Sequence, residues 1–169
     1  MIASPDPQNI PGEIRVKGAN VFLGYFKNEE ATKEVFTEDG WFRTGDMGVI
    51  DQDGCLFING RSKCMILGPS GQNIYPEEVE VVINSQPYVV DSLVVEDNGG
   101  LTALIYPDFP QGLKEGMNQK AFATFVENML PELNKELPNY ARLKKIVVMT
   151  EDFERTPKKS IKRYLYQRS

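Results

Sequence analysis

The spacing of apolar positions changes near residue 60 and divides the sequence into two parts. In the first part, residues 13–17 alternate polar and apolar side chains, which indicates a half-buried strand. Residues 47–50 and 55–58 are short apolar runs separated by Asp-Gln-Asp-Gly, a pattern typical of a hairpin. A short helix is predicted over residues 29–36. Because these elements offer few core-forming residues, we interpret residues 1–60 as the β-rich, truncated end of a larger domain.

Residues 61–169 carry longer periodic segments and are predicted to form a small domain with its own core. Pro76 is suited to the first turn of a helix, and apolar residues recur three and four positions apart after it. Residues 118–137 show the same spacing, with Pro131 expected to kink or restart the helix. Three β-rich segments are predicted strands: 89–95, 101–106 and 145–149. The predicted fold class is therefore α+β, a three-stranded sheet with helices packed on it.

Composition excludes several classes of protein. The 169 residues are 41% hydrophobic and 25% charged, which is ordinary for a globular protein, and no apolar run is long enough for a transmembrane segment. Without histidine, zinc sites and nucleophiles that depend on this residue are excluded. Cys55 and Cys64 have no metal-ligand spacing, so no metal site is predicted. We expect a reduced, cytoplasmic protein, either free or peripheral at a membrane.

The net charge of −5 hides a basic C-terminal end. From Arg142 onward there are nine basic and three acidic residues. This asymmetry indicates either contact with an anion or a solvated basic tail. Nucleic acid is disfavoured as a partner because no basic face interleaved with aromatic residues accompanies the charge.

Two polar clusters flank the predicted hairpin: Arg-Thr-Gly-Asp before it and Gly-Arg-Ser-Lys after it. So little chain separates them that they should lie close together. The carboxylate of Asp46 has two acceptor oxygens, which suit the two hydroxyls of a ribose, but Asp46 could instead start the hairpin as a turn residue. Arg61 could bind a phosphate or form an ion pair with Asp46.

Two further segments could contact a ligand, although neither contains a complete group of catalytic residues. Residues 68–71 could line a ligand channel, because glycine allows close backbone approach, or could simply connect a strand to a helix. Near the C-terminus, the basic side chains offer mobile cations for phosphate oxygens: Lys158, Lys159, Lys162 and Arg163. The usual glycine-rich phosphate loops and paired catalytic carboxylates are missing from the sequence.

Three segments, taken in their order along the chain, connect these candidate binding residues to one protein family. GYFKNEEATKEVFTEDGWFRTGD, GRSKCMILGPSGQNIYPEEVE and RTPKKSIKRYLY together resemble the adenylate-forming (AMP-binding) acyl-CoA synthetases. The resemblance covers nearly the whole chain. The sequence of the third segment is most similar to that of the long-chain fatty-acid–CoA ligases. In that family a large N-terminal domain holds ATP and the acid, and a small C-terminal domain moves over it.

The resemblance implies roles for the residues of the first two segments. Asp46 matches the aspartate that binds the ribose hydroxyls, with Arg43 in the same motif, and Arg61 matches an arginine that contacts the nucleotide. Lys63 falls where the family has the hinge between its domains. The loop glycine beside the channel for the pantetheine of CoA is matched by Gly71, and the helix that follows carries Glu78 and Glu80.

The third segment departs from the family pattern at one position. The family has a lysine three residues after the proline of this motif, where it contacts ATP and substrate during adenylation. Here that position is Ser160, preceded by Lys158 and Lys159. We expect Lys159, with Lys162 as a second candidate, to substitute through the reach of its long side chain; the other possibility is that adenylation is impaired.

The resemblance thus predicts the C-terminal portion of an ATP-dependent long-chain fatty acyl-CoA synthetase that is inactive alone. The expected ligands are ATP or AMP, CoA, a fatty acid and Mg²⁺, which would be held mainly by the N-terminal domain. An alternative is a non-catalytic module that binds a nucleotide or CoA. Another is a ligase for a different carboxylic acid or for a carrier-protein thiol.

Overall fold

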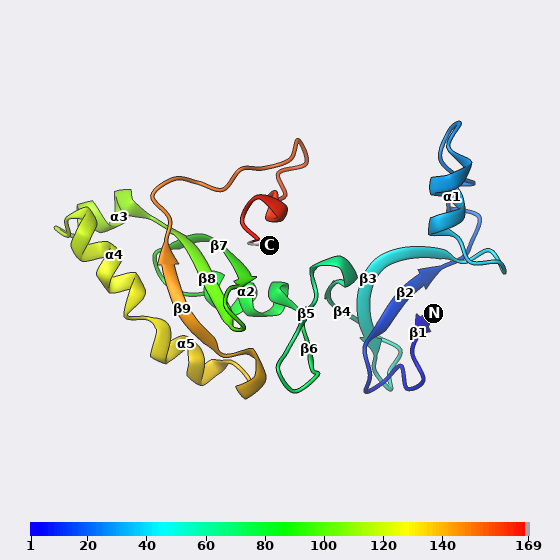
Figure 1. The fold of residues 1–169 in the computed structure, drawn as a ribbon, viewed down its shortest axis with the longest axis horizontal. Helices are drawn as coiled ribbons and strands as arrows, with labels where there is room; N and C mark the ends of the chain where they lie inside the picture. Colours follow the sequence, from blue (N-terminus) through cyan, green and yellow to red (C-terminus); the bar gives the residue numbers. More distant parts are fainter. Residues whose placement is uncertain (168–169) are drawn as a thin grey trace. The chain divides into compact units, whose positions relative to one another are not determined.

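The computed structural model describes residues 1–167, which form two compact units, residues 1–65 and residues 66 onward. Each unit has its own β-sheet, and Figure 1 shows the elements of both in chain order.

Unit 1 is a four-stranded antiparallel sheet in the order β1-β2-β3-β4. Its strands are β1 (Ile2–Ala3), β2 (Gly12–Val16), β3 (Phe42–Ile50) and β4 (Leu56–Arg61), with helix α1 (Glu29–Val35) between β2 and β3. Asn28 caps this helix, since its Oδ1 accepts a hydrogen bond of 3.0 Å from the backbone N of Ala31. The predicted hairpin and helix are thereby confirmed.

Strand β3 is longer than the sequence pattern indicates. It begins at Phe42, so the Arg-Thr-Gly-Asp cluster lies inside the strand and not before the hairpin. The reason is pairing on the other side, where β2 extends the strand through the pairs Arg15–Arg43 and Val16–Phe42.

The apolar side chains of unit 1 are largely exposed. Among the described residues of this unit, Ile2 is the one that belongs to the buried hydrophobic set. Leu23 and Phe26 are 99% and 90% exposed, and Phe57 and Ile58 on the edge strand β4 are more than half exposed. A soluble sheet rarely leaves such residues uncovered, so this surface suits a further layer of protein.

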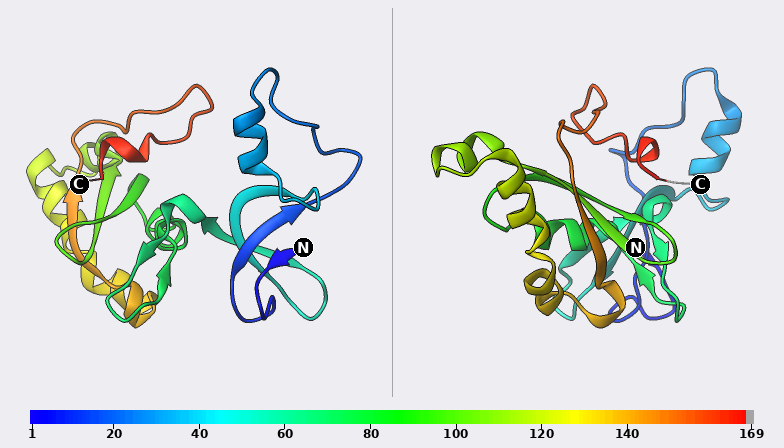
Figure 2. Two further views of the ribbon diagram at one scale, coloured as in Figure 1. Left: turned by 45° about the vertical axis from the view of Figure 1, so that its right-hand side comes forward. Right: turned by 60° about the vertical axis from the view of Figure 1, so that its left-hand side comes forward.

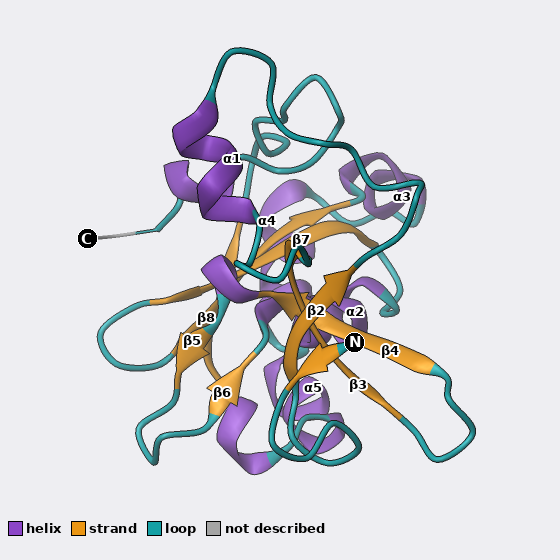
Figure 3. Cartoon of the chain, turned by 90° about the vertical axis from the view of Figure 1, so that its right-hand side faces the viewer, coloured by secondary structure: helices purple, strands orange, loops and turns teal. Residues whose placement is uncertain are grey.

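Unit 2 is organised around a mixed three-stranded sheet in the order β7-β8-β9. Strands β7 (Val89–Glu96) and β8 (Leu101–Pro107) are antiparallel, and β9 (Leu143–Val148) runs parallel to β8. Helices α2 (Pro76–Asn84), α4 (Gln119–Glu127) and α5 (Leu130–Glu136) contribute to one hydrophobic core with the sheet. Figure 3 shows these helices in purple and the strands in orange. This confirms the predicted α+β class.

The long apolar segment 118–137 forms two helices because Pro131 restarts it. Proline is tolerated in the first turn of a helix, where α5 carries it, and the break falls at residues 128–129. Helix α3 (Phe109–Lys114) was not predicted from the sequence.

The C-terminal segment covers the opposite face of the same sheet. Side chains alternate along β7, so Val94 joins the core under the helices while Leu93 and Val95 point to the other face. Phe153, Ile161 and Tyr166 pack there, and Figure 2 shows this segment following β9 and returning across the sheet. It ends in the short 3₁₀ helix η3 (Arg163–Leu165).

Short elements complete the chain: η1 (Ser62–Cys64), β5 (Ile66–Leu67), β6 (Asn73–Ile74) and η2 (Asn139–Ala141). Within residues 1–167, no helix has the length and apolar character needed to cross a membrane.

Candidate functional site

Asp46 and Arg61 form the polar centre of unit 1. They are paired residues on β3 and β4, and Arg61 Nη1 lies 2.7 Å from Asp46 Oδ1. The side chain of Asp46 is 32% exposed and that of Arg61 is 56% exposed, so both are within reach of a ligand from solvent. The two polar clusters named from the sequence therefore lie close together, as predicted.

The backbone before Asp46 is held in an unusual conformation. Gly45 has φ +74°, which favours glycine, and a Cβ there would meet only ordinary contacts with Arg61, at 3.5 Å. Thr44 Oγ1 donates to Ile14 O at 2.8 Å and accepts from Asp46 N at 3.0 Å. These contacts fix the direction in which the Asp46 carboxylate leaves the strand.

The alternative in which Asp46 starts the hairpin turn is wrong. That role belongs to Asp51, whose Oδ1 accepts hydrogen bonds from Asp53 N and Cys55 N at 3.0 and 2.8 Å. Asp46 lies within β3, five residues earlier.

Arg43 is exposed and lies on the same strand as Asp46. Its cross-strand partner is Arg15, which is neutralised by Glu13 at 3.3 Å. Arg43 therefore adds an exposed positive charge to the strand that carries Asp46.

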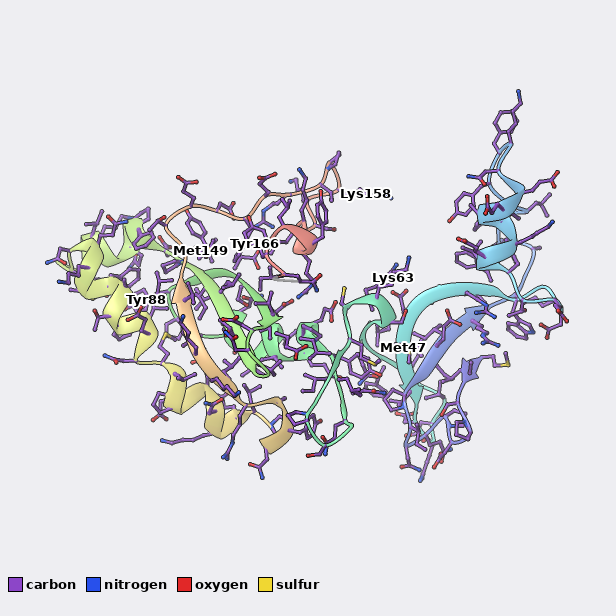
Figure 4. All side chains as sticks on the ribbon, in the orientation of Figure 1. Met47, Lys63, Tyr88, Met149, Lys158 and Tyr166 are labelled. Carbon is purple, nitrogen blue, oxygen red and sulfur yellow. The ribbon has the colours of Figure 1, made fainter. Side chains whose placement is uncertain are left out.

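Lys63 is exposed in η1, three residues before the sequence boundary between the two units (Figure 4). This position in the chain suits a pivot; the hinge role itself stays a prediction.

Gly71 lies in the turn of a small hairpin that was not predicted from the sequence. Strands β5 and β6 pair antiparallel, Gly68 N donates to Gln72 O at 2.8 Å, and Gly71 has φ +82°. No heavy atom of the described structure lies within 4 Å of a Cβ built on Gly71. The segment 68–71 is thus a hairpin turn rather than a plain connector between a strand and a helix.

A cleft of about 480 Å³ in unit 2 adjoins this hairpin. It is lined by the β5–β6 turn, the β7–β8 turn and the chain leading into β9, with Arg142 and Lys144 as its basic residues. Lys144 Nζ donates to Gly99 O at 3.0 Å. We did not single out these two residues from the sequence, although the basic segment begins at Arg142.

The C-terminal basic residues form a second hairpin, which we call the tail hairpin (residues 154–162). Arg155 pairs with Ile161, Thr156 N donates to Ser160 O at 2.8 Å, and Lys162 N donates to Glu154 O at 2.8 Å. Its tip, residues 157–160, is exposed, and Lys159 has φ +64°.

The lysines of the tail hairpin have different surroundings. Lys162 is paired with Glu154 at 3.1 Å, and the hydrogen bond from this ammonium group to the carboxylate raises the pKa of Lys162. Lys158 and Lys159 are exposed at the tip, and Figure 4 shows Lys158 at the turn. Of the two candidates named from the sequence, Lys159 is thus the one in the turn itself.

The glutamates of α2 also differ. Glu78 is exposed. Glu80 is buried, and its carboxylate accepts hydrogen bonds from Arg163 near the C-terminus.

Within residues 1–167, no group of three or more Cys, Asp or Glu side chains is arranged so that it could hold a metal ion.

Comparison with known proteins identifies the class to which this fold and these motifs belong. Residues 64–168 match the AMP-binding enzyme C-terminal domain, and the chain belongs to this family of adenylate-forming CoA ligases.

Particular relatives differ in the acid for which they are named. The chain is 33% identical over 172 residues to the long-chain-fatty-acid–CoA ligase FadD15 of Mycobacterium tuberculosis, covering 90% of the chain and 28% of that protein. It is 47% identical over 89 residues to the 2-succinylbenzoate–CoA ligase of Bacillus cytotoxicus, covering 53% of the chain and 18% of the relative. The chain thus spans less than a third of these relatives.

Among solved structures, ATP-bound MatB from Rhodopseudomonas palustris is similar with a TM-score of 0.72 and 34% identity. The match covers 95% of the chain and 30% of MatB.

Proposed function

We propose that this chain is the C-terminal part of an ATP-dependent acid–CoA ligase. In the first half-reaction a carboxylate oxygen of the acid attacks the α-phosphorus of ATP, the bond to the β-phosphate oxygen breaks, and pyrophosphate leaves. In the second, the CoA thiolate attacks the acyl carbon of the adenylate, and AMP leaves with the electrons of the broken C–O bond. Both half-reactions are expected to need an N-terminal domain in addition to these residues.

The observation that carries this proposal is the Asp46–Arg61 pair at the end of unit 1. The Asp46 carboxylate can accept hydrogen bonds from two vicinal hydroxyls, and Arg61 beside it can donate to the same nucleotide. Arg61 lies three residues before residue 64, where the match to the AMP-binding enzyme C-terminal domain begins. We therefore assign ribose binding to Asp46, with Arg61 and Arg43 as cationic support.

The exposed apolar surface of unit 1 supports an N-terminal partner domain. Strand β4 is an edge strand, and Leu56, Phe57 and Ile58 present three consecutive exposed apolar side chains there. An uncovered hydrophobic edge strand promotes aggregation in a soluble protein. Its proposed cover is the remainder of the large domain, which would also hold Mg²⁺ with the ATP phosphates.

For the second half-reaction we place CoA at the Gly71 hairpin. The open space around Gly71 would admit the thin pantetheine arm, and the adjoining cleft is lined by Arg142 and Lys144, which suit phosphate groups. Lys63 would then be the pivot that exchanges this face for the tail hairpin between half-reactions.

We propose a long-chain fatty acid as the carboxylate. The support is the similarity to FadD15, which is 33% identical over 90% of the chain, against 31% over 91% for the 2-methylpropanoate–CoA ligase. Relatives named for 2-succinylbenzoate and 2-methylpropanoate are also similar. Acid specificity is expected to depend on the N-terminal domain. We also propose a cytoplasmic location, which fits the proposed substrates.

A second candidate is a non-catalytic module that binds a nucleotide or CoA. The observation that favours it is Ser160, because a serine at this position supplies no cation for the phosphate charge. If Lys159 does not substitute, the protein would bind ATP without cleaving it.

The natural full-length protein distinguishes these functions in a coupled assay of pyrophosphate release and thioester formation. The acids offered would be palmitate, 2-succinylbenzoate, 4-coumarate and 2-methylpropanoate. We expect pyrophosphate release that depends on palmitate, followed by palmitoyl-CoA on addition of CoA. Release with another acid alone would overturn the fatty-acid assignment, and ATP binding without release with any acid would support the non-catalytic module.

A further inference from the structure

An arginine–carboxylate contact between residues far apart in the chain fastens Arg163, which directly follows the tail hairpin, to helix α2. Arg163 Nη1 and Nη2 donate to Glu80 Oε1 and Oε2 at 2.8 and 2.9 Å, and Nη1 also donates to Val94 O at 3.0 Å. The two-pronged geometry matches the planar guanidinium and fixes its orientation as well as its position.

This contact also completes the edge of the sheet. Val94 lies on β7, an outer strand, and Glu80 Oε1 accepts from Val94 N at 2.7 Å while Arg163 donates to Val94 O. Both outward backbone groups of Val94 are thus satisfied by the same ion pair. The side chains of Arg163 and Glu80 are only 16% and 12% exposed, so solvent screens the pair weakly. Burial raises the pKa of Glu80, and the hydrogen bonds from Arg163 and Val94 oppose that rise.

The other arm of the tail hairpin has an anchor of its own. Arg155 Nη2 lies 2.7 Å from Asp91 Oδ2 on β7 and 3.0 Å from Asp152 Oδ1. Arg155 Nη1 donates to the carbonyl of Lys159 at 3.3 Å. One side chain therefore links the sheet to the backbone of the residue proposed as the substitute cation.

The tip between these anchors is held by its own backbone. Lys159 N donates to Thr156 O at 2.8 Å, and the positive φ of Lys159 closes the turn. Because the tip is exposed, its conformation depends on the two arms and not on packing around it.

We propose that Arg163 and Arg155 are positioning residues that hold the tail hairpin so that Lys159 is presented to the reacting phosphate in one geometry. This role rests on the proposed adenylation activity. Without the Arg163–Glu80 contact the hairpin keeps its lysines but loses their fixed placement. Misplacement of a catalytic group by about 1 Å is enough to lower a rate by about 100-fold.

Hydrogen exchange on this 169-residue chain tests the anchoring without reference to activity. In Arg163→Ala the backbone amides of Thr156, Lys159 and Lys162 should exchange at least about tenfold faster, while those of Ala103 and Ile105 in β8 keep their rates. Glu80→Gln carries the same test if Arg163→Ala folds poorly. Unchanged exchange in the tail hairpin overturns the proposal, as does equal acceleration in β8, which would indicate a role in global folding.

Half-reaction kinetics in the natural full-length protein test the positioning role. Arg163→Ala should lower kcat for adenylation by about 10- to 100-fold with the KM for ATP changed less than about twofold. Thioester formation from supplied acyl-adenylate should keep its rate, and Arg163→Lys should restore part of the loss. Lys145→Ala, which removes an exposed charge from β9, is the matched control.

Equal losses in both half-reactions would overturn the positioning role. If the unaltered protein shows no adenylation, the proposed function fails, while the exchange experiment still decides whether Arg163 anchors the hairpin.

Discussion

Asp46 and Arg61 face each other across strands β3 and β4, and one hydrogen bond of 2.7 Å joins their side chains. The pair is partly exposed, so water already competes with it and a nucleotide can enter without breaking a buried contact. A ribose hydroxyl approaching Asp46 would therefore meet Arg61 at the same time.

Arg61→Ala should change nucleotide binding much more than stability. Exposed ion pairs contribute about 1 kcal/mol or less, so the melting temperature of the chain should fall by no more than a few degrees. In the full-length protein the KM for ATP should rise at least about tenfold, because a hydrogen bond from a charged donor contributes about 1.5–3 kcal/mol. Thermal unfolding and initial rates of pyrophosphate release measure the two effects, with Arg61→Lys as the comparison. An unaltered KM for ATP would show that Arg61 acts only within the ion pair.

The core of unit 2 could be predicted because local patterns specify it. The apolar spacing over residues 118–137 gives α4 and α5, and Pro131 gives their separation. Helix α3 could not be predicted in this way, because Phe-Pro-Gln-Gly-Leu-Lys has no apolar period. It forms where Gly112 packs directly beneath the ring of Phe122, a contact between different elements.

Only part of the candidate site could be predicted from the sequence, because some of its contacts join residues far apart in the chain. Asp46 and Arg61 are separated by one hairpin, so their proximity follows from the sequence. Glu80 and Arg163 are 83 residues apart, and nothing local indicates their pairing. The β5–β6 hairpin around Gly71 has strands of two residues, too short to show alternation.

Lys63→Pro should slow thioester formation more than adenylation in the full-length protein. Proline fixes φ near about −65° and removes a backbone N–H, which stiffens η1 where the proposed pivot lies. Separate measurement of pyrophosphate release and of acyl transfer from supplied acyl-adenylate checks this, with Lys63→Ala expected to retain both rates. Equal loss in the two half-reactions would point to a defect in folding or binding instead.

Single alanine substitutions at Lys159 and Lys162 should have unequal effects on adenylation. Lys162 is already paired with Glu154, whereas Lys159 lies in the exposed turn. We expect Lys159→Ala to lower kcat by about 100-fold or more and Lys162→Ala by less than about fivefold. Ser160→Lys, which restores the family residue, should rescue Lys159→Ala. If both alanine variants keep full activity, no lysine of these two supplies the cation.

Acidification should remove the contribution of Asp152 to stability. The hydrogen bond from Arg155 lowers the pKa of Asp152 below its ordinary value of 3.8. A carboxyl group with a lowered pKa in the folded state stabilises the fold above its unfolded-state pKa and loses this effect as the pH falls through the folded-state pKa. The melting temperature of the unaltered chain should thus exceed that of Asp152→Asn at pH 7, and the difference should vanish toward pH 2. A difference independent of pH would contradict this assignment.

Acid-dependent pyrophosphate release by the natural full-length protein, compared between Asp46→Ala and Asp53→Ala, tests the central assignment most directly. Both variants remove one carboxylate from the same hairpin, but Asp53 lies in its exposed turn, away from Arg61. Loss of two hydrogen bonds to a charged acceptor predicts a fall in kcat/KM for ATP of at least about 100-fold in Asp46→Ala. Asp53→Ala should stay within about twofold of the unaltered protein. Equal activity of the two variants would contradict the assignment of Asp46 to the nucleotide.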